Sequence, residues 1–106
     1  MKKTKLHWID QAQADLVAIR GTIAKDQPLN ADKFVRRLRK SAGRLRSFPH
    51  AGWIVEELND PQVREIVYGN DRVAYHYDGK RVVVLSVMHA ARVPHWDYIL
   101  DLLDNA

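Results

Sequence analysis

The spacing of apolar residues along the chain first follows a helical period. The apolar positions of the first such segment would form one buried stripe: Ala12, Leu16, Ile19 and Ile23. Their intervals of four, three and four residues predict a helix that runs to about Lys25. Asp10 and Gln13 have the spacing of a capping box at its start, and Pro28 ends it.

A second amphipathic helix is predicted to begin near Asn30 and to end before Pro49, with Leu29 and Phe34 placed to pack as a hydrophobic staple. Its apolar face would comprise Phe34, Leu38, Ala42, Leu45 and Phe48. Its opposite face is almost wholly basic and carries Lys33, Arg36, Arg37, Arg39, Lys40, Arg44 and Arg46. The short connection between the two helices predicts an antiparallel helical hairpin.

Strand-like segments follow. Residues 63–68, 72–77 and 81–88 are rich in β-branched and aromatic residues, and Trp53–Leu58 is a weaker candidate. Asp78-Gly79 between two of these segments is a strong signal for a tight hairpin, because such turns need residues that tolerate positive φ.

The two ends of the chain add one element each. Residues 4–9 have strand composition, and His95–Leu103 could form a short helix with its apolar residues on one side. The expected fold is α+β, with an N-terminal strand, a helical hairpin packed on a mainly antiparallel sheet of about four to five strands, and a short C-terminal helix.

The last predicted strand is apolar on both faces, so we expect it to be central in the sheet. The helical hairpin would cover one face, and either the C-terminal segment or a partner would cover the other. A two-residue turn at Asp78-Gly79 would pair Tyr75 with Val82 and place Arg72 and His89 on one face. Arg64 would join them if the Gly69-Asn70 turn keeps the alternation.

This predicted cluster, with Arg92 just beyond the strand, is the candidate site. Arginines can hold phosphate or carboxylate, and a histidine can transfer a proton near neutral pH. Plainer interpretations stay open for each residue. Arg64 and Arg72 could be exposed strand charges, and His89 and Arg92 the polar exit of the strand. Trp96 could cap the core rather than stack on a ligand.

Composition limits the function classes. The 106 residues are expected to form one domain, residues 1–106, and the absence of cysteine excludes disulfides and thiolate chemistry. The net charge of +4 suits an anionic partner. No secretory leader, membrane span, metal-ligand spacing or phosphate loop is apparent, so we expect a cytoplasmic protein without cofactor or metal.

Three stretches together resemble the RelE/ParE family of toxins from type II toxin–antitoxin modules: QAQADLVAI, FVRRLRKSAGRLRSFPHAGW and VREIVYGNDRVAYHYDGKRVVVLSVMHAAR. The most specific parts are the Arg64-Glu65 pair, Arg72 followed by an apolar-x-Tyr strand, and the closing Val-x-His-x-x-Arg. The resemblance implies a compact toxin that is neutralised by a small cognate antitoxin, with DNA contacted only indirectly through that antitoxin and no membrane partner.

Two activities divide the family. RelE-like members cleave mRNA on the ribosome, and the resemblance then implies roles for Arg72 and Arg92 on the phosphate and for His89 or His95 in proton transfer. Trp96 falls roughly where those enzymes carry a C-terminal tyrosine. The two lysines of RelE fall on Val63 and Glu65, which is a departure because an acid there would weaken phosphate binding.

ParE-like members inhibit DNA gyrase, and the helix-hairpin signature, Arg64-Glu65 and the Pro-x-x-Gly exit resemble that side more closely. The preferred interpretation is therefore a ParE-like toxin that acts by protein–protein inhibition, with gyrase as its target. The residues then expected in antitoxin or target contact are Arg64, Arg72, Arg92, His95 and Trp96. A ribosome-dependent endoribonuclease and a non-toxic binding remnant are the alternatives.

Overall fold

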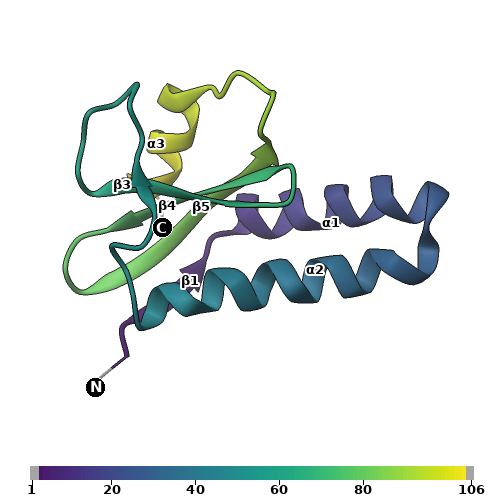
Figure 1. Cartoon of the computed structure of the whole chain (residues 1–106). Coiled ribbons are helices and arrows are strands. Elements are labelled where there is room, and N and C mark those ends of the chain that lie inside the picture. Colours follow the sequence, from purple (N-terminus) through teal and green to yellow (C-terminus); the bar gives the residue numbers. More distant parts are fainter. Residues whose placement is uncertain (1–2, 105–106) are drawn as a thin grey trace.

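The computed structural model describes residues 3–104, and over this range the α+β architecture expected from the sequence is confirmed (Figure 1). In chain order the elements are β1 (Lys5–Trp8), α1 (Asp10–Asp26), α2 (Pro28–Gly43), a short 3-10 helix η1 (Arg44–Arg46), β2 (Trp53–Ile54), β3 (Val63–Tyr68), β4 (Asp71–Tyr77), β5 (Arg81–His89) and α3 (Trp96–Asp104). No helix within the described range is long and apolar enough to cross a membrane.

The strands form one mixed sheet in the order β1-β5-β4-β3-β2. β1 pairs parallel with β5, and the other neighbours are antiparallel. The α1–α2 hairpin lies on one face of the sheet and α3 on the other (Figure 1). Every residue from Val82 to Met88 is consequently buried, which confirms that β5 is internal and covered on both faces. The C-terminal segment supplies the second cover.

Both helix starts differ from the expected caps. Ile9, not Asp10, occupies the N-cap of α1, and no side chain caps that end. α2 begins at Pro28, because proline fits the first helical turn, where its missing N–H costs no hydrogen bond. Leu29 is 94% exposed and Phe48 is 63% exposed, so the expected staple and the last position of the apolar face are both wrong.

The pairing of β4 with β5 also differs from the expectation. Tyr77 lies opposite Val82, so four residues separate this pair where the sequence predicts two. The Asp78 side chain accepts hydrogen bonds from the backbone N–H groups of Lys80 and Arg81. A β-bulge follows, since Tyr75 pairs with Val84 but Ala74 pairs with Ser86. One extra residue in β5 exchanges the faces beyond it.

The bulge overturns the predicted cluster. Arg72 lies opposite Met88, whereas His89 lies opposite Asp71, so Arg72 and His89 point to opposite faces of the sheet. The Gly69-Asn70 turn is a two-residue loop with positive φ at the glycine, as in a type II′ hairpin, and it pairs Val67 with Arg72. Arg64 pairs with Tyr75 and therefore lies on the face opposite to Arg72, so the expectation that it joins Arg72 is wrong.

Asp15 of α1 fixes the helical hairpin to β5. β1 ends opposite Val84, so the edge of β5 beyond that point lacks a neighbouring strand. There Asp15 Oδ2 accepts hydrogen bonds from the Ser86 hydroxyl (2.8 Å) and the Val87 backbone N–H (2.9 Å), while Gln11 donates to Oδ1 (2.8 Å). One carboxylate thus satisfies two polar groups that would otherwise be buried unpaired.

Gly52 marks a second close contact. Its backbone N–H donates to the hydroxyl of the fully buried Tyr75 (3.0 Å), which itself donates to the Pro49 carbonyl oxygen (2.8 Å). A Cβ atom at residue 52 would lie 2.7 Å from the Glu65 carbonyl oxygen and from the Tyr75 ring. The Pro-x-x-Gly exit is therefore the segment in which the chain leaves η1 and passes directly over Tyr75.

Candidate functional site

Arg72 lies at the centre of a polar cluster between the sheet and α3. Its Nε and Nη2 atoms donate to Glu65 Oε2 at 2.8 and 2.5 Å, and Glu57 lies 3.8 Å from Nη2. The guanidinium also lies over the Trp96 ring, 5.6 Å from its centroid, within the range of a cation–π interaction. Trp96 Nε1 donates to Glu57 Oε2 at 2.7 Å.

This arrangement balances the charge of Arg72 inside the protein. The side chains of Arg72 and Glu65 are only 13% and 18% exposed, so their ion pair is shielded from water and held in place. The Arg72–Trp96 contact and the Glu57 hydrogen bond join the start of α3 to the sheet. The cluster can therefore position α3, and any anion that approached Arg72 would compete with Glu65.

The side chain of Arg64 is also engaged, but by backbone. Its Nε atom donates to the Pro61 carbonyl oxygen at 3.1 Å, and Nη1 donates to the Gly52 carbonyl oxygen at 3.0 Å. These bonds fasten the segment around β2 to β3. Arg64 thus lies far along the strand from His89 and does not join Arg72.

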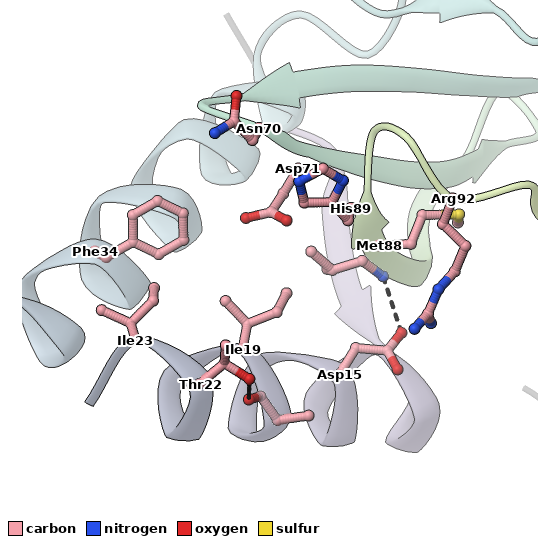
Figure 2. A pocket seen from close by; sticks show the side chains of 12 residues that line it. Asp15, Ile19, Thr22, Ile23, Phe34, Asn70, Asp71, Met88, His89 and Arg92 are labelled. Atoms are coloured by element: carbon pink, nitrogen blue, oxygen red, sulfur yellow. Dashed lines mark hydrogen bonds between the residues drawn. The ribbon is translucent and has the colours of Figure 1, made fainter. Parts of the chain in front are cut away.

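Two of the other predicted residues lie at the far end of β5, on the side of the helical hairpin. His89 and Arg92 line a pocket of about 430 Å³ together with Asp71. Its wall on the side of the hairpin is formed by Ile19, Ile23 and Phe34, as Figure 2 shows. Within residues 3–104 the structure therefore divides the predicted site residues between two faces.

His89 is exposed, and its Nδ1 atom accepts a hydrogen bond from the Ala91 backbone N–H at 3.1 Å. A neutral His89 consequently carries its proton on Nε2. Arg92 also lines a smaller pocket of about 150 Å³ with His95, on the side of α3. His95 and Arg92 are both exposed, whereas Trp96 is half-buried and packs against the core.

Asp71 is a site residue that no sequence motif distinguishes. It is 9% exposed, and burial raises the pKa of its carboxyl, an effect that the nearby His89 partly offsets. From sequence it resembles an ordinary turn residue after Gly69-Asn70. Only its pairing with His89 and the packing of α2 reveal that it is enclosed.

Replacement of Asp71 with asparagine is expected to stabilise the free protein at pH 7. Because the pKa of the Asp71 carboxyl is higher in the folded than in the unfolded protein, protonated Asp71 contributes to stability. This contribution is fully present below the unfolded-state pKa and is lost as the pH rises through the folded-state pKa. The advantage of Asp71→Asn should therefore shrink on acidification below about pH 4. Thermal unfolding of both proteins between pH 3 and 8 measures this, and a wild type that is the more stable protein at pH 7 would contradict it.

Metal binding has no support in the described residues, because no group of three histidine, aspartate or glutamate side chains could hold an ion there. The seven basic residues of the predicted helix face, five in α2 and two in η1, are all exposed, as the sequence pattern predicts. Arg39 additionally lies over the Trp8 ring, 5.0 Å from its centroid.

Comparison with known proteins agrees with this architecture. The family described as "ParE toxin of type II toxin-antitoxin system, parDE" matches residues 6–94. Toxin RelE2 of Caulobacter vibrioides is 33% identical over 87 residues, which cover 81% of this chain and 94% of that protein.

Two solved structures share the fold. The chromosomal ParDE toxin–antitoxin system from P. aeruginosa has a TM-score of 0.70 at 24% identity, over 82% of this chain and 96% of that chain. The toxin–antitoxin complex RelBE2 from Mycobacterium tuberculosis has a TM-score of 0.55 at 20% identity, over 84% and 99% of the two chains. At these identities the likeness concerns the fold alone. Because the family match spans most of the sequence, the chain belongs to the ParE toxin family of type II toxin–antitoxin systems.

Proposed function

We propose that residues 1–106 act as one cytoplasmic toxin domain that arrests growth by binding and inhibiting DNA gyrase, and that a cognate antitoxin neutralises it. The protein then works as a protein–protein inhibitor and not as an enzyme. It contacts operator DNA only through the antitoxin.

The observation that carries this proposal is the Arg72–Glu65 ion pair. In the ribonuclease interpretation Arg72 would neutralise the scissile phosphate. Here Glu65 accepts from two nitrogen atoms of that guanidinium, and Trp96 covers it. A phosphate would have to displace a shielded carboxylate, which costs much of the energy that it would gain. The opposite orientation of His89 adds to the argument, because a proton-transfer group must lie beside the phosphate.

The proposal of an antitoxin partner is supported by the family and by two solved structures with the same fold. Both structures are described as toxin–antitoxin assemblies. Among the residues expected in contact with the antitoxin or the target, Arg92 and His95 are exposed and available for direct contact. Arg64, Arg72 and Trp96 would contribute by holding the surrounding backbone and α3 in place.

A ribosome-dependent endoribonuclease is the second candidate, and one observation favours it. His89 is exposed at a pocket that Arg92 also lines, with the Asp71 carboxylate beside it. An imidazole next to a carboxylate and an arginine is a reasonable acid–base group for cleavage by a ribose 2′-hydroxyl. Arg92 would then have to replace Arg72 on the phosphate.

The purified protein tests the two candidates directly. In a reconstituted supercoiling assay, gyrase should lose activity as toxin is added, and the antitoxin should restore it. In a parallel reaction, ribosomes programmed with mRNA should leave the message intact. Cleavage of the message without inhibition of gyrase would select the endoribonuclease, and neither effect at saturating protein would indicate a binding remnant.

Two variants separate the candidates in cells. His89→Gln should retain growth arrest under the gyrase proposal, whereas an enzyme that uses His89 should lose about a hundredfold or more in cleavage. The double variant Arg72→Leu with Glu65→Leu removes both charges and keeps the apolar packing, so the fold should survive. Growth curves after induction measure arrest, and antitoxin binding confirms folding. Loss of arrest in His89→Gln, with antitoxin binding intact, would contradict the gyrase proposal, whereas loss in the double variant would show that the Arg72–Glu65 pair holds the contact surface in place.

A further inference from the structure

We propose that the pocket between the α1–α2 hairpin and the ends of β4 and β5 receives one lysine or arginine side chain of the antitoxin, whose cation pairs with Asp71. This inference rests on the proposed function, because it takes the partner to be the cognate antitoxin. It adds the chemistry of one anchoring contact and the residue that recognises it.

The first argument is the state of the Asp71 carboxylate. As a residue Asp71 is nine-tenths buried, yet within residues 3–104 its carboxylate makes no hydrogen bond or ion pair, and His89 acts on it only electrostatically. Asp15 and Glu65, which are also largely enclosed, each accept at least two hydrogen bonds. No buried side-chain oxygen of the described residues lacks a hydrogen-bond partner, so the Asp71 carboxylate oxygens still reach the open pocket, where a cationic ligand could pair with them.

The second argument is the shape of the pocket. Ile19, Ile23 and Phe34 form an apolar wall, and Figure 2 shows the Asp71 carboxylate beyond that wall, beside His89. A lysine or arginine side chain has the matching construction, since its aliphatic stem packs on apolar groups while its head seeks an anion. The volume of about 430 Å³ accommodates such a side chain together with part of the backbone that carries it.

The cationic side chains of the toxin that line the pocket do not pair with the Asp71 carboxylate. Arg92 reaches toward Asp15 at the edge of the pocket in Figure 2, and makes no ion pair with Asp71. The His89 ring is held through Nδ1 by the Ala91 backbone and makes no hydrogen bond to Asp71. A metal ion is a poor alternative, because Asp71 would be joined by too few ligands.

Charge complementarity explains how this contact would make antitoxin binding specific. The toxin carries a net charge of +4, so an acidic partner supplies general attraction, which many basic proteins would share. A basic side chain of the antitoxin is attracted by Asp71 but repelled by the basic surface of the rest of the toxin. The pocket is therefore the place where such a side chain binds favourably. Such a contact raises specificity more than bulk affinity.

The test uses the wild-type toxin and the antitoxin-like protein expected from the neighbouring reading frame. Binding is measured by calorimetry for wild-type toxin, for Asp71→Asn and for Asp10→Asn, an exposed control at the start of α1. Each lysine and arginine of the antitoxin is then changed to methionine, which keeps an apolar stem and removes the charge. The variants are combined with Asp71→Asn in double-mutant cycles.

We expect Asp71→Asn to weaken binding by about tenfold or more, and Asp10→Asn to leave it unchanged. One antitoxin variant should cause the same loss with wild-type toxin and no further loss with Asp71→Asn. Thermal unfolding confirms that Asp71→Asn is folded.

Two outcomes would overturn the inference. If Asp71→Asn binds like wild type, or if its loss is independent of every basic residue, the pocket does not take a cation, although the proposed toxin function stands. If the adjacent protein does not bind wild-type toxin at all, the proposed antitoxin partnership fails and the inference fails with it.

Discussion

The Gly52→Ala variant is expected to lose about 3 kcal/mol of its free energy of unfolding, the upper range for overpacking of a tight site. The added methyl group would meet the Glu65 carbonyl oxygen and the Tyr75 ring at 2.7 Å. Tyr75 is fully buried and cannot retreat, and any shift of the segment to relieve the clash would strain the hydrogen bond from the residue 52 N–H to its hydroxyl. The melting temperature should fall by about 10–20 °C for a chain of this size.

Gly21 provides a matched control for this prediction. It lies inside α1, and nothing comes within 4 Å of a Cβ atom built there. Gly21→Ala should therefore stabilise the protein by about 0.5–1 kcal/mol through its higher helix propensity. Denaturant titration of both variants measures the difference. A Gly52→Ala protein as stable as wild type would show that the segment around residue 52 is not held against Tyr75.

Replacement of Asp15 with alanine is expected to cost about 2–4 kcal/mol. The change leaves the Ser86 hydroxyl and the Val87 N–H buried without an acceptor, and each unpaired group costs about 1–3 kcal/mol. Ser86 is only 8% exposed, so water cannot readily replace the carboxylate. Because Asp15 joins α1 to β5, the hairpin itself should become mobile. Amide hydrogen exchange in α1 and β5 measures this loss of protection.

Asp15→Asn gives a graded comparison. The remaining amide oxygen can still accept from Ser86 and Val87, so the cost should fall to about 1 kcal/mol. Asp10→Ala at the start of α1 removes a carboxylate of the same helix and should cost less than about 1 kcal/mol. Equal losses in the alanine and asparagine variants of Asp15 would contradict the proposed role of its oxygen atoms.

The elements of the fold could be predicted because each depends on a local pattern. The four-three-four spacing from Ala12 to Ile23 produces α1. The doubly apolar run from Val82 to Met88 produces an internal strand, because burial of both faces requires cover on both sides. The helix starts were less predictable, since Pro28 and Ile9 occupy positions that the capping patterns assign to other residues.

The arrangement of the candidate site could not be predicted in the same way. One extra residue in β5 places Arg72 and His89 on opposite faces, and the Asp78-Gly79 signal does not reveal that bulge. An acid at Glu65 is visible in the sequence as an obstacle to phosphate binding, but its pairing with Arg72 depends on the register of β3 with β4. Asp71 and Asp15 carry no motif that distinguishes them from surface acids.

By itself, the sequence determined the order and type of the elements, the central apolar strand and the family resemblance. These follow from periodicity, turn residues and composition, which act between neighbours in the chain. Tertiary structure alone decided which charges meet. Arg72 pairs with Glu65 and lies over Trp96, Asp15 accepts a hydrogen bond from Ser86, and Asp71 lies beside His89 in a pocket. Strand register and the packing of α1, α2 and α3 set those distances.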